Sequence, residues 1–305
     1  MISATIDIGT NAVLLLIAEY KIPPSPRGGG DLKVLWDEAQ ITRLGESLHK
    51  FHLFIPTARK RTLAVLKEYR RKCDSYQAKE ISAVGTAAFR KAENAGEFLQ
   101  EVEKETGIKI KIISGEREAA LSYLSVKKDF GQHPHLYALD IGGGSTELIS
   151  EEGGTSFDIG GVLLTEKIVR HDPPTDKEIR EMKKAIDRAI QFPTSPDQTP
   201  TLVGLAGSVT TLSAIKQKLE YWDGARVQGS ILTLSDLNRM IRLFRTTTIE
   251  EKRKIPGMVH GREDTILAGT LILKNAMEKL GTDQVIVSDR GLRYGLFYER
   301  LLNFK

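Results

Sequence analysis

The feature that most constrains this chain is a short motif that occurs twice. Asp7-Ile8-Gly9-Thr10, in the stretch ATIDIGTNAVLLLIAEY, matches Asp140-Ile141-Gly142-Gly143, in the stretch LDIGGGSTELIS. In each copy an apolar run ends in aspartate, a glycine-rich turn follows, and a second apolar run begins. This order is typical of two β-strands joined as a hairpin. A chain that repeats such a hairpin is expected to repeat the fold built around it.

The pattern around the two motifs predicts one βββαβαβ unit repeated, with insertions in the second copy, and hence an α/β fold. In the first half we expect strands at Ala4–Asp7, Val13–Tyr20, Lys33–Glu38, Glu80–Val84 and Lys109–Ile113, and helices at Thr57–Lys72, Asn94–Glu105 and Glu116–Val126. In the second half we expect strands at Leu136–Asp140, Thr146–Ser150, Thr155–Ile159, Thr201–Leu205 and Gln284–Ser288, and helices at Leu163–Arg170, Asp176–Gln191, Ser208–Leu219, Ser235–Phe244, Arg262–Leu280 and Gly291–Leu302. The stretches Pro23–Gly30 and Phe192–Pro200 read as loops because they are rich in proline.

Length and charge narrow the class of protein. A chain of 305 residues is long for one core, so we predict two domains, residues 1–118 and 119–305. Net charge is +4, from 44 basic and 40 acidic residues, which does not argue for a nucleic-acid partner. The apolar run Val13–Ala18 is too short to span a bilayer, and we expect neither a signal peptide nor a membrane partner. A single cysteine, Cys73, allows no intrachain disulfide and indicates the cytoplasm, where we expect an unreactive thiol.

The two glycine-rich turns have the chemistry of an anion site. Glycine permits close backbone approach, and a turn lined with N–H groups cradles phosphate. The side chains of Thr10, Asn11, Ser145 and Thr146 add donors. The alternative is that a glycine-rich turn is only a turn, and for the first copy alone that interpretation would be favoured. The presence of two copies favours a facing pair of phosphate-binding turns.

The aspartate before each turn has a different role, because a carboxylate repels phosphate. Asp7 and Asp140 are therefore candidates to hold a divalent cation or an activated water. A third stretch, Gly204–Ile215, runs from an apolar strand into Gly207-Ser208 and a helix, and helix N-termini bind phosphate or ribose. Ser208 could equally be a plain helix N-cap.

These three motifs follow the layout of the actin-like ATPase superfamily. Within it the chain closely resembles the exopolyphosphatase / guanosine pentaphosphate phosphohydrolase (Ppx/GppA) family. The resemblance covers nearly the whole chain in order, through the stretches IDIGTNAV, GTAAFRKAENAGEFL, IKIISGEREAALSYL, LDIGGGSTELI, GLAGSVTTLSAI, REDTILAG and VSDRGLRYGL. It implies two RNase H-like domains with the site in the cleft between them. It also implies hydrolysis of a terminal phosphoanhydride with Mg²⁺ or another divalent cation.

The resemblance also implies residue roles. Glu118 matches the family's general base, Arg90 its phosphate-binding arginine, and Asp140 and Glu147 its metal-binding and catalytic acids. From the residues alone, Glu116 competes with Glu118, and Arg90 could form a surface pair with Glu93. The implied set is catalytic Glu118, Arg90 and Glu147; phosphate-binding Gly9, Thr10, Asn11, Gly142, Gly143, Gly144, Ser145, Thr146, Gly207, Ser208 and Arg262; and metal-binding Asp140 and Asp7.

One departure from the family pattern bears on the substrate. Many relatives carry Arg or His where this chain has Leu14, a position linked in the family to guanosine polyphosphate recognition. Arg262 could still supply a basic contact, or it could be a helix N-terminal residue paired with Glu263 or Asp264. We predict an exopolyphosphatase that releases orthophosphate from polyphosphate, and pppGpp hydrolysis is the near alternative. More distant alternatives are an actin-like sugar or acetate kinase and a non-catalytic nucleotide-binding module. A homodimer is left open.

Overall fold

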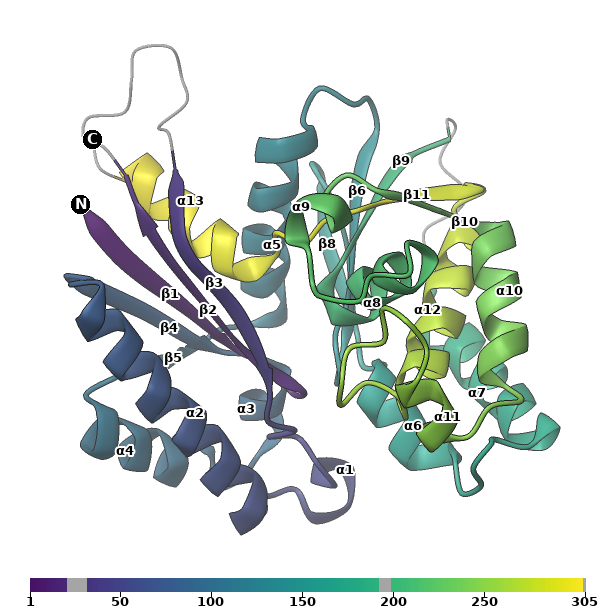
Figure 1. Ribbon diagram of the computed structural model, residues 1–305, viewed down its shortest axis with the longest axis horizontal. Coiled ribbons are helices and arrows are strands. Elements are labelled where there is room, and N and C mark those ends of the chain that lie inside the picture. The colour runs from purple at the N-terminus through teal and green to yellow at the C-terminus, as the bar shows by residue number, and fades with distance from the viewer. Residues whose placement is uncertain (21–31, 192–198, 304–305) are drawn as a thin grey trace. The chain divides into compact units, whose positions relative to one another are not determined.

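Each half of the chain builds its own mixed β-sheet covered by helices (Figure 1). The computed structural model describes residues 1–20, 32–191 and 199–303. The chain forms two units, Met1–Ser125 with Leu292–Lys305, and Val126–Gly291. The predicted loop Pro23–Gly30 and most of Phe192–Pro200 lie outside the described residues. No helix among the described ranges combines the length and the apolar composition needed to cross a membrane.

The first unit contains a five-stranded sheet of order β3-β2-β1-β4-β5. Its strands are β1 (Ile2–Ile8), β2 (Ala12–Glu19), β3 (Lys33–Ile41), β4 (Glu80–Gly85) and β5 (Ile110–Ile112). Its helices are α1 (Leu48–Phe51), α2 (Pro56–Ser75), α3 (Ala87–Lys91), α4 (Ala95–Thr106), α5 (Gly115–Phe130), which continues into the second unit, and α13 (Leu292–Asn303). Strands β1, β2 and β3 pair antiparallel, whereas β4 and β5 run parallel to β1.

Side chains alternate between the two faces of this sheet, as strand geometry requires. Val13, Leu15 and Ile17 of β2 enter the core beneath α2 and α4. Leu16 and Ala18 point to the opposite face and pack against Tyr294, Phe297 and Tyr298 of α13. The apolar run in β2 is therefore continuous because helices cover both of its faces.

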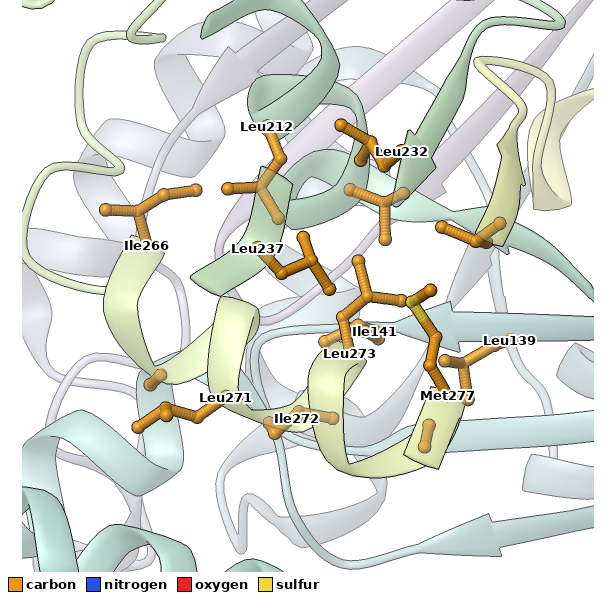
Figure 2. Close-up of a cluster of buried hydrophobic side chains, with 14 of the residues drawn as sticks. Leu139, Ile141, Leu212, Leu232, Leu237, Ile266, Leu271, Ile272, Leu273 and Met277 are labelled. Carbon is orange, nitrogen blue, oxygen red and sulfur yellow. The ribbon is translucent and has the colours of Figure 1, made fainter. Parts of the chain in front are cut away.

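The second unit contains a six-stranded sheet of order β10-β11-β9-β6-β7-β8. Its strands are β6 (Leu136–Ile141), β7 (Thr146–Ser150), β8 (Gly153–Phe157), β9 (Thr201–Leu205), β10 (Ile231–Thr233) and β11 (Gln284–Val287). Its helices are α6 (Gly161–Ile168), α7 (Asp176–Ala189), α8 (Ala206–Lys216), α9 (Gly224–Val227), α10 (Leu234–Phe244), α11 (Ile249–Arg253) and α12 (Ile266–Lys279). Helix α12 is the centre of the core, where Leu273 and Met277 lie among Leu139, Ile141 and Leu237 (Figure 2).

The predicted repeat is confirmed at the level of strand order and register. The order β3-β2-β1-β4-β5 recurs as β8-β7-β6-β9-β11, with β10 added at the edge. In the first hairpin Asp7 lies opposite Leu14, and in the second Asp140 lies opposite Glu147. The insertion between β9 and β11 holds β10 and helices α8–α12. The two aspartates thus occupy equivalent positions in two copies of one fold.

The chain divides at different residues from those expected. The expected boundary after Glu118 falls inside α5, and α13 belongs to the first unit although we expected it in the second. The reason is packing, because α13 supplies the aromatic side chains that cover β2. Helix α12 also begins later than expected, at Ile266, so that Arg262 lies in the preceding turn and is not a helix N-terminal residue.

Candidate active site

The two glycine-rich motifs form the same turn. The N–H of Gly9 donates to the carbonyl of Ala12 at 2.9 Å, and the N–H of Gly142 donates to the carbonyl of Ser145 at 3.0 Å. Each bond closes a four-residue turn at the end of the strand that carries the aspartate. The repeated sequence therefore produces a repeated backbone, in the first unit and again in the second.

The polar side chains of the turns are all buried, but they differ in whether they already form hydrogen bonds within the protein. Thr10, Asn11 and Ser145 are each less than a tenth exposed. The Oδ1 of Asn11 is buried and has no hydrogen-bond partner among the described residues. In contrast, the Thr146 hydroxyl donates to the carbonyl of Ile159 at 2.7 Å, so this predicted phosphate donor serves a hydrogen bond within the second unit. Thr10, Asn11 and Ser145 fit the predicted role better than Thr146 does.

Arg90 and Glu118, predicted separately, are brought into direct contact in the first unit. Arg90 Nη1 donates to Glu118 Oε2 at 2.8 Å and to the carbonyl of Ile113 at 2.9 Å. The two side chains are 24% and 13% exposed, so solvent screens their attraction only in part. The surface pair of Arg90 with Glu93 is absent from the ion pairs of the described residues. Arg90 is the last-turn cation of α3 and Glu118 lies in the first turn of α5.

Glu116, the competitor for the role of base, has a different environment. It is exposed, and a hydrogen bond from the Ser114 hydroxyl lowers the pKa of its carboxyl. An exposed carboxylate of low basicity is a poor proton acceptor. Glu118 differs from Glu116 in being partly buried and in being held in one position by Arg90.

Asp140 and Glu147 form a pair of acids in the second unit. They lie directly opposite each other on β6 and β7, so their side chains share one face of the sheet. Glu147 is fully buried and accepts a hydrogen bond from the Ser156 hydroxyl at 2.7 Å. In the first hairpin the equivalent position opposite Asp7 is Leu14, so the acid pair is not duplicated.

The donor set can be compared with what Mg²⁺ requires. No group of three or more His, Cys, Asp or Glu side chains within the described ranges could hold a metal ion by itself. Mg²⁺ commonly uses one or two carboxylates and takes its other ligands from water and substrate phosphates. The carboxylates of Asp140 and Glu147 in the second unit, and Asp7 with the unpartnered Asn11 Oδ1 in the first, fit such a substrate-dependent site.

The third motif starts helix α8 at the end of β9. The helix begins at Ala206, which has a positive φ of 66°, and its N-cap is Leu205. Ser208 lies inside the helix and is buried, so the N-cap alternative is wrong. A Cβ added to Gly207 would lie 1.8 Å from Nη2 of Arg262, so a side chain at this position would require the guanidinium to move.

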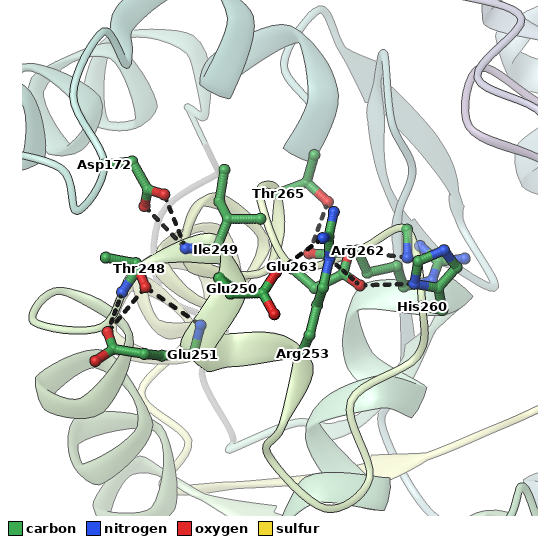
Figure 3. A network of polar contacts seen from close by, with 11 residues as sticks. Asp172, Thr248, Ile249, Glu250, Glu251, Arg253, His260, Arg262, Glu263 and Thr265 are labelled. Carbon is green, nitrogen blue, oxygen red and sulfur yellow. Dashed lines mark hydrogen bonds and ion pairs between the residues drawn. The ribbon is translucent and has the colours of Figure 1, made fainter.

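Arg262 is a cation with no carboxylate partner within the described parts of the chain. Its guanidinium makes no hydrogen bond or ion pair with the described residues, and burial lowers the pKa of Arg262 to about 10, which keeps it charged at neutral pH. Glu263, its expected partner, is 3% exposed and is occupied elsewhere, by His260 Nδ1 at 3.1 Å, the Gly261 N–H at 2.8 Å and Arg253 Nε at 3.6 Å (Figure 3). A partly buried guanidinium beside a helix N-terminus is suited to an anion.

Sequence reasoning missed the residues that support these groups. The sequence indicates Glu263 only as a partner for Arg262, and it does not distinguish Gly45 and Gly160, which contact the two turns, from other loop glycines. The sequence signal for Glu263 is its position directly after Gly261-Arg262. A glycine turn leaves backbone N–H groups that need an acceptor when they are buried, and a neighbouring carboxylate can supply one.

The chain is similar to known proteins over nearly its whole length. A model of the Ppx/GppA phosphatase family matches residues 25–304. Exopolyphosphatase 2 of Mycobacterium tuberculosis is 30% identical over 310 residues, 96% of either chain. A bifunctional 3-dehydroquinate synthase/phosphatase of Fusobacterium nucleatum is 32% identical over 98% of this chain, which spans 46% of that protein. A guanosine-5'-triphosphate,3'-diphosphate pyrophosphatase of Photobacterium profundum is 29% identical over 98% of this chain and 59% of its own length.

Solved structures agree with the sequence relatives. The Ppx/GppA family member of Aquifex aeolicus has a TM-score of 0.81 and is 32% identical in sequence. The match covers 99% of this chain and 98% of the Aquifex aeolicus chain. An exopolyphosphatase of Cytophaga hutchinsonii has a TM-score of 0.87 at 26% identity, with 100% and 99% coverage of this chain and that one. The expected two-domain actin-like fold is thereby confirmed. The chain belongs to the Ppx/GppA phosphatase family.

Proposed function

We propose that this protein is an exopolyphosphatase, which hydrolyses the terminal phosphoanhydride of inorganic polyphosphate and releases orthophosphate. The observation that carries the reaction is the contact between Arg90 and Glu118, which joins a phosphate-binding cation to a carboxylate base. The substrate class is supported by the similarity to exopolyphosphatase 2 over nearly the whole of both chains.

In the proposed reaction the repeated turns bind phosphate oxygens through their backbone N–H groups. Glu118 accepts a proton from a water whose oxygen forms a bond to the terminal phosphorus, while the bond from that phosphorus to the bridging oxygen breaks. Arg90 and Arg262 neutralise charge on the phosphoryl group, which is the largest contribution that a protein makes to phosphoryl transfer. Asp140 with Glu147 in the second unit, and Asp7 in the first, are the carboxylates that would hold Mg²⁺ or another divalent cation, which would supply further charge neutralisation when bound.

The near alternative is hydrolysis of pppGpp, the kind of reaction named for the Photobacterium profundum relative. Leu14 favours polyphosphate over this alternative, because its side chain cannot donate a hydrogen bond to a nucleotide phosphate. It occupies the position directly opposite Asp7 at the first turn. We further propose a cytoplasmic location, which fits a single cysteine whose pKa is raised to about 12 by burial. Light scattering would test whether the protein forms a homodimer.

The experiment is substrate-resolved phosphate release. The purified protein is incubated with long-chain polyphosphate, with pppGpp, and with ATP plus a sugar or acetate, each with and without Mg²⁺. Release of orthophosphate from polyphosphate in preference to pppGpp supports the proposal. Preference for pppGpp makes the protein a guanosine polyphosphate phosphohydrolase, phosphate transferred to the acceptor makes it a kinase, and no turnover favours a binding module.

A further inference from the structure

In the first unit, the segment that follows the third strand folds back onto the first turn. The N–H groups of Thr42 and Arg43 both donate to the carbonyl of Asn11, at 3.0 and 2.9 Å, and the N–H of Gly45 donates to the carbonyl of Thr10 at 2.9 Å. Leu44, fully buried, anchors this segment in the core, and Arg61 of α2 donates to the carbonyl of Thr42 at 2.9 Å. The segment is therefore fixed between α2 and the turn.

The second unit repeats this arrangement after its own third strand. The N–H of Gly161 donates to the carbonyl of Gly142 at 3.0 Å, and the N–H groups of Val162 and Leu163 donate to the carbonyl of Gly143 at 2.9 and 3.0 Å. The first N–H groups of a helix have no partner within the helix. Here those of α6 are satisfied by the turn.

A glycine stands at the closest approach in both copies. A Cβ on Gly45 would lie 2.3 Å from Cγ2 of Thr10, and a Cβ on Gly160 would lie 2.6 Å from the carbonyl carbon and oxygen of Gly143. Real Cβ atoms do not approach other heavy atoms this closely, so a side chain at Gly160 must displace the backbone of its turn, and one at Gly45 must displace the Thr10 side chain or the turn that carries it. Neither glycine has a positive φ, so the requirement is for space and not for backbone freedom.

These contacts fix the direction of the central peptide group in each turn. A trans peptide is planar, so its N–H points opposite to its C=O. Because the Thr10 carbonyl points to Gly45, the Asn11 N–H points away from Gly45, and the Gly144 N–H points away from α6 for the same reason. Asn11 and Gly144 are residue types that tolerate the positive φ of the flipped, type II turn, yet neither adopts it.

We propose that the segments Thr42–Gly45 and Gly160–Leu163 are clamps that hold the central peptide of each turn in its phosphate-donating orientation, with Gly45 and Gly160 as positioning residues. This inference rests on the proposed function for its ligand, a phosphate oxygen. Without a clamp the central peptide flips, and a carbonyl oxygen replaces the N–H that faces the anion. The duplicated fold thus carries a duplicated device for orienting a backbone donor.

The test is a rescue experiment at the first clamp. Gly45→Ala is expected to raise KM for polyphosphate on the order of tenfold, as for loss of one hydrogen bond to a charged group. Thr10→Ser removes the methyl group that the new Cβ would strike and keeps the hydroxyl, and the remaining contacts with Thr10 are at 3.3 Å. Gly45→Ala with Thr10→Ser is therefore expected to return KM close to that of Thr10→Ser alone. Gly96→Ala is the control, because a Cβ there meets no atom within 4 Å.

Hydrogen exchange provides a readout that does not depend on catalysis. Amide exchange in residues 9–12 should be faster in Gly45→Ala than in the wild type and should slow again in the double variant. Unchanged exchange and unchanged KM in Gly45→Ala would overturn the clamp. Faster exchange with an unchanged KM would show that the turn is clamped but does not bind the substrate. A wild type without phosphohydrolase activity would refute the proposed function alone, since exchange would still decide whether the clamp exists.

Gly160→Ala extends the test to the second unit. Its Cβ would meet backbone atoms of Gly143 and Gly144, for which no side-chain substitution gives relief. We expect a larger rise in KM than for Gly45→Ala and faster exchange in residues 142–145. A Gly160→Ala protein with native exchange and KM would remove the second clamp from the proposal.

Discussion

At the scale of single residues, the candidate site is a set of charged groups whose partners decide their roles. Glu118 and Glu116 are two residues apart on the first turn of α5, yet one meets Arg90 and the other meets solvent and the Ser114 hydroxyl. Arg90 and Arg262 likewise differ, since Arg90 is paired with Glu118 and Arg262 has no carboxylate partner among the residues that the structure describes. These differences lead to separate predictions for turnover and for substrate binding.

Replacement of Glu118 should affect turnover more than binding. Glu118→Gln keeps the shape of the side chain but removes its ability to accept a proton, so kcat should fall about 10²- to 10⁴-fold with a small change in KM. Glu116→Gln is the matched control, because it changes an exposed carboxylate on the same helix turn. Steady-state phosphate release measures both. A Glu118→Gln enzyme with near-native kcat, or a loss confined to Glu116→Gln, would assign the base elsewhere.

Replacement of Arg90 should weaken substrate binding. Arg90→Ala removes the guanidinium proposed to bind phosphate and also breaks the ion pair with Glu118, so KM for polyphosphate should rise about tenfold or more. Arg70→Ala is the control, because Arg70 pairs with Asp74 on the exposed face of α2, away from the candidate site residues of the first unit. If Arg90→Ala leaves KM unchanged, Arg90 only supports Glu118, and the phosphate contact belongs to another residue.

At the scale of elements, the turns and caps are held by buried acceptors. The Glu263 carboxylate accepts a hydrogen bond from the Gly261 N–H and contacts His260 and Arg253 (Figure 3). Gly257 and Gly261 both adopt a positive φ where the chain turns before Arg262. Helix α7 has a similar acceptor at its start. Glu178 forms a capping box with Thr175 and also accepts from the Arg170 N–H.

The Glu263 carboxylate should position Arg262 without contacting substrate. Glu263→Gln keeps the size of the side chain but loses the charge that holds Arg253 and His260, so the turn loosens and KM should rise severalfold with kcat little changed. Glu250→Gln is the control, because Glu250 pairs with the same Arg253 at the surface. Arg262→Ala should also raise KM with little change in kcat, and its KM should rise more than that of Glu263→Gln. A change in kcat alone for Glu263→Gln would contradict a positioning role.

The capping carboxylate of α7 makes stability depend on pH. Burial would raise the pKa of Glu178, but the bonds from His171, Thr175 and Arg170 outweigh it and lower the pKa from 4.5 to about 2. Because the folded pKa is depressed, the stabilisation is present above pH 4.5 and is lost as pH falls towards 2. Glu178→Gln should therefore cost about 3 kcal/mol of unfolding free energy at pH 7 and progressively less below pH 4.5.

Urea denaturation between pH 7 and pH 3 measures this dependence. Glu181→Gln on the same helix is the control, because that carboxylate is exposed and outside the capping box. A difference between wild type and Glu178→Gln that stays constant over this pH range would show that the side chain stabilises by shape and not by charge.

At the scale of the whole molecule, the sequence predicted the duplicated sheet because each copy carries its own strand pattern and its own Asp-Ile-Gly turn. It did not predict that α13 completes the first unit, because the contact of Phe297 with Tyr20 joins residues at opposite ends of the chain. The clamps were missed for a related reason. Gly45 is required because a side chain there would collide with Thr10, but in the sequence it cannot be distinguished from any other loop glycine. Gly9 and Gly142 can be recognised because they belong to a motif that occurs twice. Arg90 and Glu118 were found only through the family resemblance, since their contact spans 28 residues.

The place of α13 can be tested with the two tryptophans of the chain, because Trp36 lies in the first unit and Trp222 in the second. Phe297 is 1% exposed and packs edge-on against Tyr20 at 5.4 Å between ring centroids. Phe297→Ala should therefore cost about 3–5 kcal/mol in the first unit. In a Trp222→Phe background, Trp36 is the only tryptophan, and the unfolding midpoint that its fluorescence reports should fall in Phe297→Ala. Leu302→Ala, an exposed position on the same helix, should leave this midpoint unchanged.

The same substitutions in a Trp36→Phe background are followed by Trp222, which reports the second unit. If Phe297→Ala lowers the midpoint reported by Trp222 and not the one reported by Trp36, then α13 stabilises the second unit, as the sequence led us to expect. A shift seen by both tryptophans to the same extent would mean that the two units unfold as one cooperative body.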